Sequence, residues 1–464
     1  MPYLGLFFCT MEGTTQTKTY KVTISNQDIL RMALPISLAI LVPQINFITN
    51  NIFLGHLDET GNALSTAGIT GVYYLLFAVI GQGLNNGLQA LIARRAGEGR
   101  IEEIGKLFSQ SLIITLALSA VGILITWFLA PYILSFSLHS EQLRQQAIQF
   151  LRIRIWGLPF LYVYQMRNAL LVGTNQSKFL VYGTLAETVV NIVLDYGLIF
   201  GHLGLPAIGF NGAAISSIFA EAAGMGVVFL VIHAKGISQE LQLFKHWTFD
   251  PKNSRLILVQ SSPLVFQYTI SIMSWVFFYI LVEHHGRQAL AISNTMRNIF
   301  GLFGVSTWAF ASTANAMVSN IIGQGMENKV TELIGKITKL SMSFAIVVAI
   351  LLNLFPGLFL SVYGQDPAFT IAAIPVIRIV SSALVLMSFS IVWLNAVTGT
   401  GNTRVNLLIE FVTIIFYCCY VYLVLERWNL SLMAGWMSEW VYWLSIFIQS
   451  FFYIRSGWWK GKVI

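Results

Sequence analysis

Twelve long apolar segments follow one another along the 464-residue chain. A transmembrane helix takes about 20 predominantly apolar residues, so each segment is long enough to cross a lipid bilayer. The chain has 10% charged residues, against about 25% in a soluble domain. We therefore predict an all-α membrane protein with 12 transmembrane helices. The segments lie at residues 29–54, 65–91, 108–131, 147–172, 179–200, 211–234, 257–282, 289–319, 334–361, 369–398, 405–425 and 432–454.

The second half of the sequence repeats motifs of the first half at an offset of about 226 residues. Gln89–Gly99 (QALIARRAGEG), at the end of the second apolar segment, corresponds to Asn315–Gly325 (NAMVSNIIGQG), at the end of the eighth. Gly173–Lys178 likewise corresponds to Gly399–Arg404. Because each half contains an even number of helices, both halves should have the same orientation. Such parallel repeats are found in secondary transporters.

The distribution of positive charge predicts the orientation. Most of the 27 Lys and Arg residues fall in the two terminal stretches and in the loops on the same side, whereas Arg144, Arg287 and Arg427 lie in the opposite loops. Cytoplasmic loops are rich in Lys and Arg, so both termini should be cytoplasmic. The predicted division is a cytoplasmic tail (1–28), a first lobe (29–234), a cytoplasmic linker (235–256), a second lobe (257–455) and a cytoplasmic tail (456–464).

The fifth apolar segment carries two acids and an amide on one helical stripe, because Glu187, Asn191 and Asp195 are spaced four residues apart. An acid near the centre of a bilayer costs about 2.5–3.5 kcal/mol on insertion scales, and such residues are by default functional. Asp195 with Asn191 is therefore a candidate site for H+ or Na+. The alternative is a protonated Asp195 that makes a hydrogen bond between helices.

Other polar residues inside the apolar segments admit two interpretations. Glu187 could relay protons, but Glu410 occupies the corresponding place in the eleventh segment, which favours a structural role for both. Glu221 and Glu439 are candidates for contact with a substrate or for pairing with an Arg. Arg297, near the start of the eighth segment, is a further candidate for substrate contact.

Several functional classes find no support in the sequence. It contains no Walker-type glycine loop and no cluster of zinc ligands or nucleophiles, so we expect no enzyme activity and no cofactor. Cys9, Cys418 and Cys419 lack the spacing of a metal site. The net charge of +7 is spread over loops and has no nucleic-acid-binding pattern. A small-molecule substrate and the lipid bilayer are the expected partners.

In its ordered motifs the chain resembles the multidrug and toxic compound extrusion (MATE) family over about residues 25–455. The motifs are Asn50–Gly55, Arg94–Gly99, Phe150–Ile153, Gly173–Lys178, Asn191-x3-Asp195, Gly209–Ser217, Pro263–Gln267 and Gly399–Arg404. The resemblance implies two six-helix lobes that form a V around a central cavity. It also implies export of organic, often cationic compounds against entry of Na+ or H+. We expect a monomer in a bacterial inner membrane.

Two other transporter classes remain as alternatives. A lipid-linked precursor flippase of the same superfamily would need a strongly cationic cavity for phosphates, for which Arg167 and Arg297 are candidates. A sugar or metabolite carrier of a different 12-helix fold is the other, and the order of the motifs argues against it.

The resemblance also assigns roles to individual residues. One branch of the family binds its cation with an Asp on helix 1, an Asn-x3-Asp on helix 5 and a hydroxyl on helix 6. The matching positions here are Asn50, Asn191 with Asp195, and Ser217. Asn50 departs from the pattern, so Asp195 is the one carboxylate of the expected cation site. Other members use a Glu on helix 7 and an Asp on helix 10, where this chain has Gln267 and no acid respectively.

Overall fold

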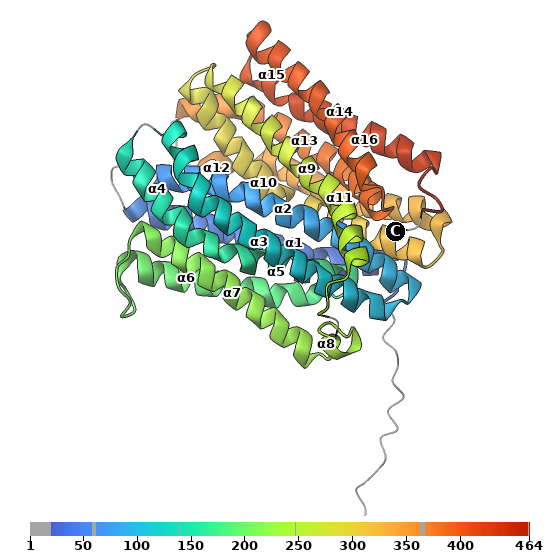
Figure 1. The fold of residues 1–464 in the computed structure, drawn as a ribbon. Helices are drawn as coiled ribbons and strands as arrows, with labels where there is room; N and C mark the ends of the chain where they lie inside the picture. The colour runs from blue at the N-terminus through green and yellow to red at the C-terminus, as the bar shows by residue number, and fades with distance from the viewer. Residues whose placement is uncertain (1–19, 58–61, 139, 246, 362–366, 463) are drawn as a thin grey trace, which may run out of the picture.

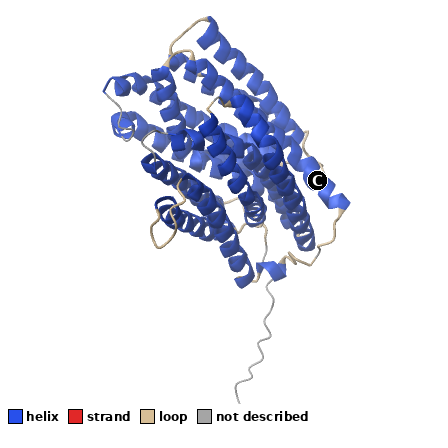
Figure 2. Ribbon diagram, turned by 60° about the vertical axis from the view of Figure 1, so that its left-hand side comes forward, coloured by secondary structure: helices blue, strands red, loops and turns tan. Residues whose placement is uncertain are grey.

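In the computed structural model of the chain, residues 20–57, 62–138, 140–245, 247–361, 367–462 and 464 are described, and all regular structure in these ranges is helical (Figures 1 and 2). Cys9 and the first 19 residues of the predicted tail lie outside these ranges. Each predicted apolar segment falls within one of twelve long helical segments, so the predicted order of twelve helices along the chain is confirmed. Eight of these are long and apolar enough to cross a membrane by length and composition alone. Twelve spans remain a prediction.

The first half comprises six of these segments and the second half the other six. The first six are α1 (Asn26–Leu57), α2 (Asn62–Glu98), α3 (Ile101–Ser137), α4 (Glu141–Arg154) with η1 (Ile155–Gly157) and α5 (Leu158–Gly173), η2 (Ser177–Phe179) with α6 (Leu180–Phe200), and α7 (Phe210–Ala234). The others are α9 (Pro251–Glu283), α10 (Arg287–Gly323), η3 (Glu327–Lys329) with α11 (Val330–Leu354) and α12 (Pro356–Ser361), α13 (Pro367–Gly399), α14 (Thr403–Val421) with the π-helix η4 (Tyr422–Arg427), and α15 (Leu432–Trp436) with α16 (Ser438–Ser456).

The connection between the halves contains the short helix α8 (Ile237–Glu240) and packs against α3. Ser109 Oγ donates to the Leu243 carbonyl oxygen at 2.6 Å. Helix α9 begins at Pro251, six residues before the predicted start of its span. The reason is local: Pro251 occupies the first helical turn, and the Asp250 carboxylate accepts from the backbone N–H groups of Lys252 and Asn253.

The repeat is expressed as a two-fold contact between α2 and α10. Gln89 Nε2 donates to the Ser312 carbonyl oxygen at 2.7 Å, and Asn315 Nδ2 donates to the Asn86 carbonyl oxygen at 3.0 Å. Each of these hydrogen bonds is the copy of the other, because Gln89 and Asn315 are equivalent in the repeat, as are Asn86 and Ser312. The sequence repeat is therefore a structural repeat.

Two equivalent glycines bring the ends of α2 and α10 into backbone contact. A Cβ atom on Gly97 would lie well inside van der Waals distance of the Asn320 carbonyl oxygen, and one on Gly323 would meet the Arg94 carbonyl oxygen in the same way. Here too each contact is the copy of the other in the repeat. This end of the molecule, which we call the closed end, is sealed by helix backbones.

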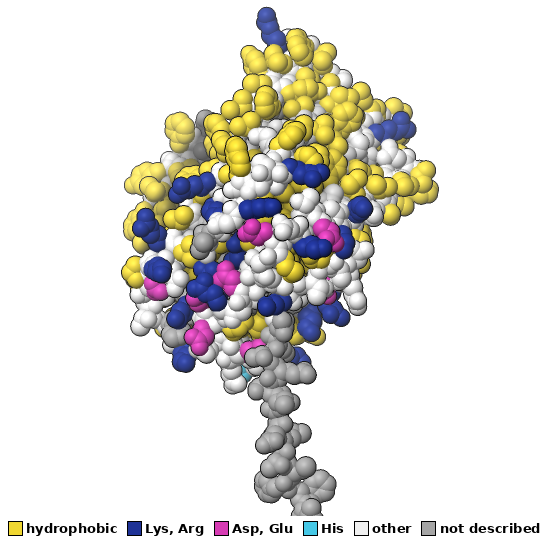
Figure 3. All heavy atoms as spheres, turned by 90° about the vertical axis from the view of Figure 1, so that its right-hand side faces the viewer, with side chains coloured by type: hydrophobic (Ala, Val, Ile, Leu, Met, Phe, Trp, Pro, Cys, Tyr) yellow, Lys and Arg dark blue, Asp and Glu magenta, His cyan; other side chains and the backbone are white. Residues whose placement is uncertain are grey.

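Both ends of the described chain lie on the closed end and reach the opposite half. Asn320 Oδ1 on α10 accepts from the Val22 backbone N–H at 3.1 Å, and Gln324 Nε2 donates to the Val22 carbonyl oxygen at 3.0 Å. Near the C-terminus, the Lys462 carbonyl oxygen accepts from Arg94 Nη1 of α2 at 3.4 Å. Figure 3 shows Lys and Arg side chains spread over the face on the side of the C-terminus.

A second contact between the halves lies next to the closed end. Helices α2 and α9 are in close contact where Gly87 meets Ser261 and Gly83 meets Val265. Further from the closed end, large apolar side chains on both helices are exposed, including Val72 and Leu76 on α2 and Met273 and Ile280 on α9. The contacts between α2 and α9 thus lie toward the closed end, and the α1–α7 and α9–α16 groups form two sides of the molecule (Figure 1), as the predicted two-lobed fold requires.

Candidate functional site

Asp195 lies at a close contact between α6 and α7. Its side chain is fully buried, and its Oδ1 accepts a hydrogen bond from the Ser216 hydroxyl of α7. Small residues allow the two helices to approach, because an added Cβ on Gly183 would lie 3.0 Å from the Gly224 carbonyl oxygen and one on Gly212 would lie 2.7 Å from the Leu198 carbonyl oxygen. The contact therefore holds a carboxylate away from water, and no positive side chain among the described residues lies in hydrogen-bonding range of it.

Several polar atoms beside this carboxylate lack a hydrogen-bond partner among the described residues. Asp195 Oδ2 and both amide atoms of Asn191 are buried and unpaired, and so is Asn50 Oδ1 on α1. A buried polar atom without a partner costs about 1–3 kcal/mol, so a native structure that keeps several together calls for an explanation. Carboxylate and amide oxygens are hard donors of the kind that bind Na+, and a carboxylate can also take up H+.

Asn50 lies level with Asp195 on a neighbouring helix. Helices α1 and α6 run side by side in the same direction, since Ser177 Oγ donates to the Met32 carbonyl oxygen at 3.1 Å and Leu54 packs in one cluster with Ile199. Both pairs have the same sequence separation as Asn50 and Asp195. The predicted residues Asn50, Asn191 and Asp195 are therefore found in the same layer of the first half.

The predicted hydroxyl is displaced by one residue. Ser217 donates to the Ala213 carbonyl oxygen of its own helix at 2.8 Å, whereas the hydroxyl that contacts Asp195 belongs to Ser216. Consecutive residues on an α-helix point about 100° apart, so only one of two adjacent serines can face α6. Ser216 replaces Ser217 in the candidate site.

Glu221 and Glu187 lie in a buried charged cluster of the first half. Arg154 makes a two-pronged ion pair with Glu221, at 3.0 Å and 2.5 Å, and its guanidinium lies 4.0 Å from the centre of the Tyr74 ring. Glu187 packs against Gly224 of α7, and Arg167 donates to the Gly224 carbonyl oxygen at 2.9 Å. The contacts of Glu221 are those of an interhelical anchor, and those of Glu187 are packing contacts with α7.

Replacement of Glu221 by Gln should destabilise the protein. The change leaves the buried Arg154 guanidinium without its counter-ion, and breaking a buried pair in this way costs about 3–5 kcal/mol in soluble proteins. We expect a clearly lowered midpoint of thermal unfolding in detergent. The matched control is Glu141→Gln, which removes an exposed pair with Arg144 worth at most about 1 kcal/mol. An unchanged midpoint for Glu221→Gln would contradict the anchoring role of the Glu221–Arg154 pair and would favour contact with the substrate instead.

A central cavity of about 700 Å3 lies between the two halves, a volume that suits one drug-sized molecule. Helices α1, α2, α5 and the start of α6 line it from the first half, and α9, α10, α13, α14 and α16 from the second. Its polar lining is dominated by amides, namely Gln44, Gln82, Asn85, Asn86, Gln89, Gln165, Asn168, Gln267 and Asn395. Asp195, Asn191 and Asn50 are not among the lining residues, so the candidate ion site and the cavity are separate.

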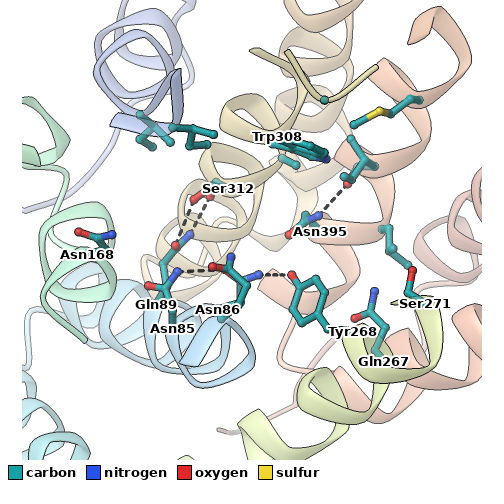
Figure 4. A pocket seen from close by; sticks show the side chains of 18 of the residues that line it. Asn85, Asn86, Gln89, Asn168, Gln267, Tyr268, Ser271, Trp308, Ser312 and Asn395 are labelled. Atoms are coloured by element: carbon teal, nitrogen blue, oxygen red, sulfur yellow. Dashed lines mark hydrogen bonds between the residues drawn. The ribbon is translucent and has the colours of Figure 1, made fainter. Parts of the chain in front are cut away.

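The cavity is bounded toward the closed end by bonds between the halves (Figure 4). Asn86 Nδ2 donates to the Tyr268 hydroxyl, and Gln89 is joined to Ser312 by two hydrogen bonds of 2.7 Å and 3.1 Å. These residues belong to α2 on one side and to α9 and α10 on the other. Four of the residues that line the cavity thus also hold the halves together beneath it.

The second half places one acid and one base on the cavity wall. Arg297 is exposed to the cavity, with its guanidinium 5.4 Å from the centre of the Tyr279 ring. Glu410 is fully buried and accepts from the Tyr442 hydroxyl at 2.5 Å and from Gln267 Nε2 at 3.4 Å. Glu439 lies behind the wall, where its carboxylate accepts from Trp443 Nε1 at 3.0 Å.

Glu410 is the residue that sequence reasoning missed. Its repeat equivalent, Glu187, suggested that both acids are structural, but the two environments differ: Glu187 faces α7, whereas Glu410 lines the cavity. One signal in the sequence could have pointed to Glu410. Gln267 stands where other family members have a Glu on helix 7, so another acid of the second half was a candidate for the cavity.

Comparison with known proteins gives one family. The MatE family model matches residues 35–197 and 263–423, one stretch in each half. The probable multidrug resistance protein NorM of Thermotoga maritima is 23% identical over 416 residues, which is 89% of this chain and 88% of that protein. The protein of the same name from Photorhabdus laumondii is 26% identical over 360 residues, or 76% of this chain and 78% of that protein.

Solved structures share the fold. An outward-facing multidrug resistance MATE family transporter of the MOP superfamily superposes with a TM-score of 0.84 at 18% identity, covering 96% of this chain and 98% of that one. A MOP superfamily transporter from Pyrococcus furiosus, described as having a binding pocket of reverse polarity, gives 0.83 at 16% identity, with 96% and 97% covered.

Proposed function

The chain belongs to the MatE family, the multidrug and toxic compound extrusion transporters, and from this premise we propose that it is a secondary active exporter of organic compounds driven by entry of H+ or Na+. The observation that carries the proposal is the layer of Asp195, Asn191 and Asn50, whose buried polar atoms lack partners. The central cavity is the proposed place of the substrate. The named relatives are bacterial, which supports a bacterial inner membrane as the location.

The geometry supports alternating access. The halves are sealed at the closed end, and with both termini in the cytoplasm this arrangement is closed toward the cytoplasm. Helix α1 connects the two sites, because Pro43 and Gln44 line the cavity while Asn50 lies in the layer of Asp195. Proline inside a membrane helix favours bending, and α1 contains Pro35 and Pro43. Ion binding at Asp195 would thus act on the shape of the cavity through α1.

The ion can drive the cycle only through a difference in its affinity for two states. A shift of the population from 1:99 to 99:1 takes about 5.5 kcal/mol of such a difference. The carboxylate of Asp195 supplies this difference in ion affinity if α6 and α7 separate in the other state and expose Asp195 to water. The unpaired Asp195 Oδ2 is the atom that an entering H+ or Na+ would engage.

The flippase alternative is not favoured by the cavity. Of the described residues that line it, Arg297 is the one basic side chain, whereas a lipid-linked phosphate would call for several. Arg167, the other candidate, is fully buried against backbone carbonyl oxygens of α7.

The proposal is tested by dye efflux from everted membrane vesicles with Na+ and H+ gradients imposed separately. We expect export under at least one gradient. Ser216→Ala should lower the half-saturating concentration of H+ by about tenfold, because the lost charge-assisted hydrogen bond, worth about 1.4 kcal/mol, stabilises the ionised form of Asp195 over the protonated one. Ser217→Ala is the control and should leave it unchanged, since its hydroxyl bonds only to its own helix. Absence of export under both gradients would refute the proposal.

A further inference from the structure

The central cavity has one acidic and one basic side chain on its wall, and the two do not pair with each other. Among the described residues, the acid on its wall is Glu410 of α14 and the base is Arg297 of α10. Neither side chain takes part in an ion pair in the described part of the chain. The rest of the polar lining is uncharged, so these two groups dominate the electrostatics of the cavity.

Glu410 is prepared for a positive group. Its carboxylate can accept about four hydrogen bonds, and its donors are neutral groups, namely the Tyr442 hydroxyl, Gln267 Nε2 and the Ser271 hydroxyl. A buried carboxylate without a counter-ion is costly, and a ligand cation would supply the missing charge. Trp275 and Trp443 line the same cavity, and aromatic rings favour a bound cation further. Glu439 fixes the indole of Trp443 by its hydrogen bond.

Arg297 is prepared for a negative group. Its contact in the structure is the face of the Tyr279 ring at 5.4 Å, which leaves its N–H donors available. The planar guanidinium presents paired donors that match a carboxylate, and its charge persists at any physiological pH. An organic cation without an acidic group would meet Arg297 as a repulsive charge, which selects against it.

We infer that the cavity selects amphoteric organic molecules, whose ammonium-type group binds Glu410 and whose carboxylate or similar anionic group binds Arg297. This inference rests on the proposed function and narrows its substrate class. A zwitterion matches the cavity at both charges, whereas a simple cation or a simple anion satisfies one of them and opposes the other. The volume of about 700 Å3 is large enough for both groups and an apolar core.

The test is equilibrium binding to the purified full-length protein in nanodiscs. Three probes share one aromatic core and carry an amine, a carboxylic acid, or both. We expect wild-type protein to bind the amphoteric probe at least tenfold more tightly than either other probe. In Glu410→Gln, the amphoteric probe should bind no more tightly than the acid probe. In Arg297→Gln, the amphoteric probe should bind no more tightly than the amine probe. Glu410→Asp and Arg297→Lys keep the charges, so these variants should retain most of the preference for the amphoteric probe over each of the other two.

Glu332→Gln is the matched control, since this exposed acid lies on α11 outside the cavity and should leave all three affinities unchanged. The inference is wrong if wild-type protein binds the amine probe as tightly as the amphoteric one, or if Glu410→Gln weakens all three probes equally. In both cases gradient-driven export of other compounds would leave the proposed function intact. If wild-type vesicles export no compound under either gradient, the proposed function fails, and this inference fails with it.

Discussion

Asp195→Asn should reduce gradient-driven export to the level of vesicles without the protein, a loss of tenfold or more. Asn has the shape of Asp and can still accept a hydrogen bond from the Ser216 hydroxyl, so the contact between α6 and α7 should persist. The amide, however, can neither take up H+ nor offer a negative charge to Na+. An ion that no longer distinguishes two states shifts no population between them.

This result is measured as dye efflux from everted vesicles with each gradient imposed in turn, at matched expression. Substrate binding should persist, because Asp195 does not line the cavity. Glu102→Gln, an exposed acid at the start of α3, serves as the control for loss of a carboxylate as such. Wild-type efflux by Asp195→Asn under both gradients would remove Asp195 from the coupling mechanism.

Gly97→Ala should open the closed end. Its new methyl group would overlap the Asn320 carbonyl oxygen, and this atom belongs to a helix backbone that cannot move aside alone. Overpacking of a tight contact costs about 1–3 kcal/mol, which corresponds to a shift of about 5- to 150-fold in the equilibrium between closed and open arrangements. Export should fall because the outward-facing state is depopulated.

The separation is measured by the distance between spin labels at Glu102 and Lys329, two exposed positions on opposite halves of the closed end, after replacement of the native cysteines. A second, longer distance should appear in Gly97→Ala. Gly335→Ala is the control, because an added Cβ there meets no atom within 4 Å. A distance distribution identical to the wild type would show that the glycine contact does not hold this end closed.

The fold was predictable because its determinants are local or repeated. Segment length and hydropathy give each membrane helix, and the paired motifs around Gly97 and Gly323 give the two-fold arrangement. The structure adds the reason for these motifs: Gln89 and Asn315 exchange equivalent hydrogen bonds between the halves. The early start of α9 was not found from hydropathy because its cap, Asp250, lies in a polar stretch.

The candidate site was predictable only to the level of the helix. Choosing between Ser216 and Ser217 requires the rotation of α7 about its axis, which packing with α6 decides. The position of Glu410 on the cavity wall is likewise set by how the second half packs. Its equivalence to Glu187 in the sequence repeat favoured a structural role for both acids. The sequence does not specify how α1 and α6 are aligned, and this alignment places Asn50 in the same layer as Asp195.

The attachment of both chain ends to the closed end has a mechanical consequence. Val22 is tied to α10 and Lys462 to α2, so each end straps one half of the molecule to the other. Inward opening must then unfasten both straps as well as part the helices. A domain fused close to either end, or a protein that captures these residues, would compete with the fastened state and not with the substrate. The conformational cycle could thus be tuned from outside the transport pathway.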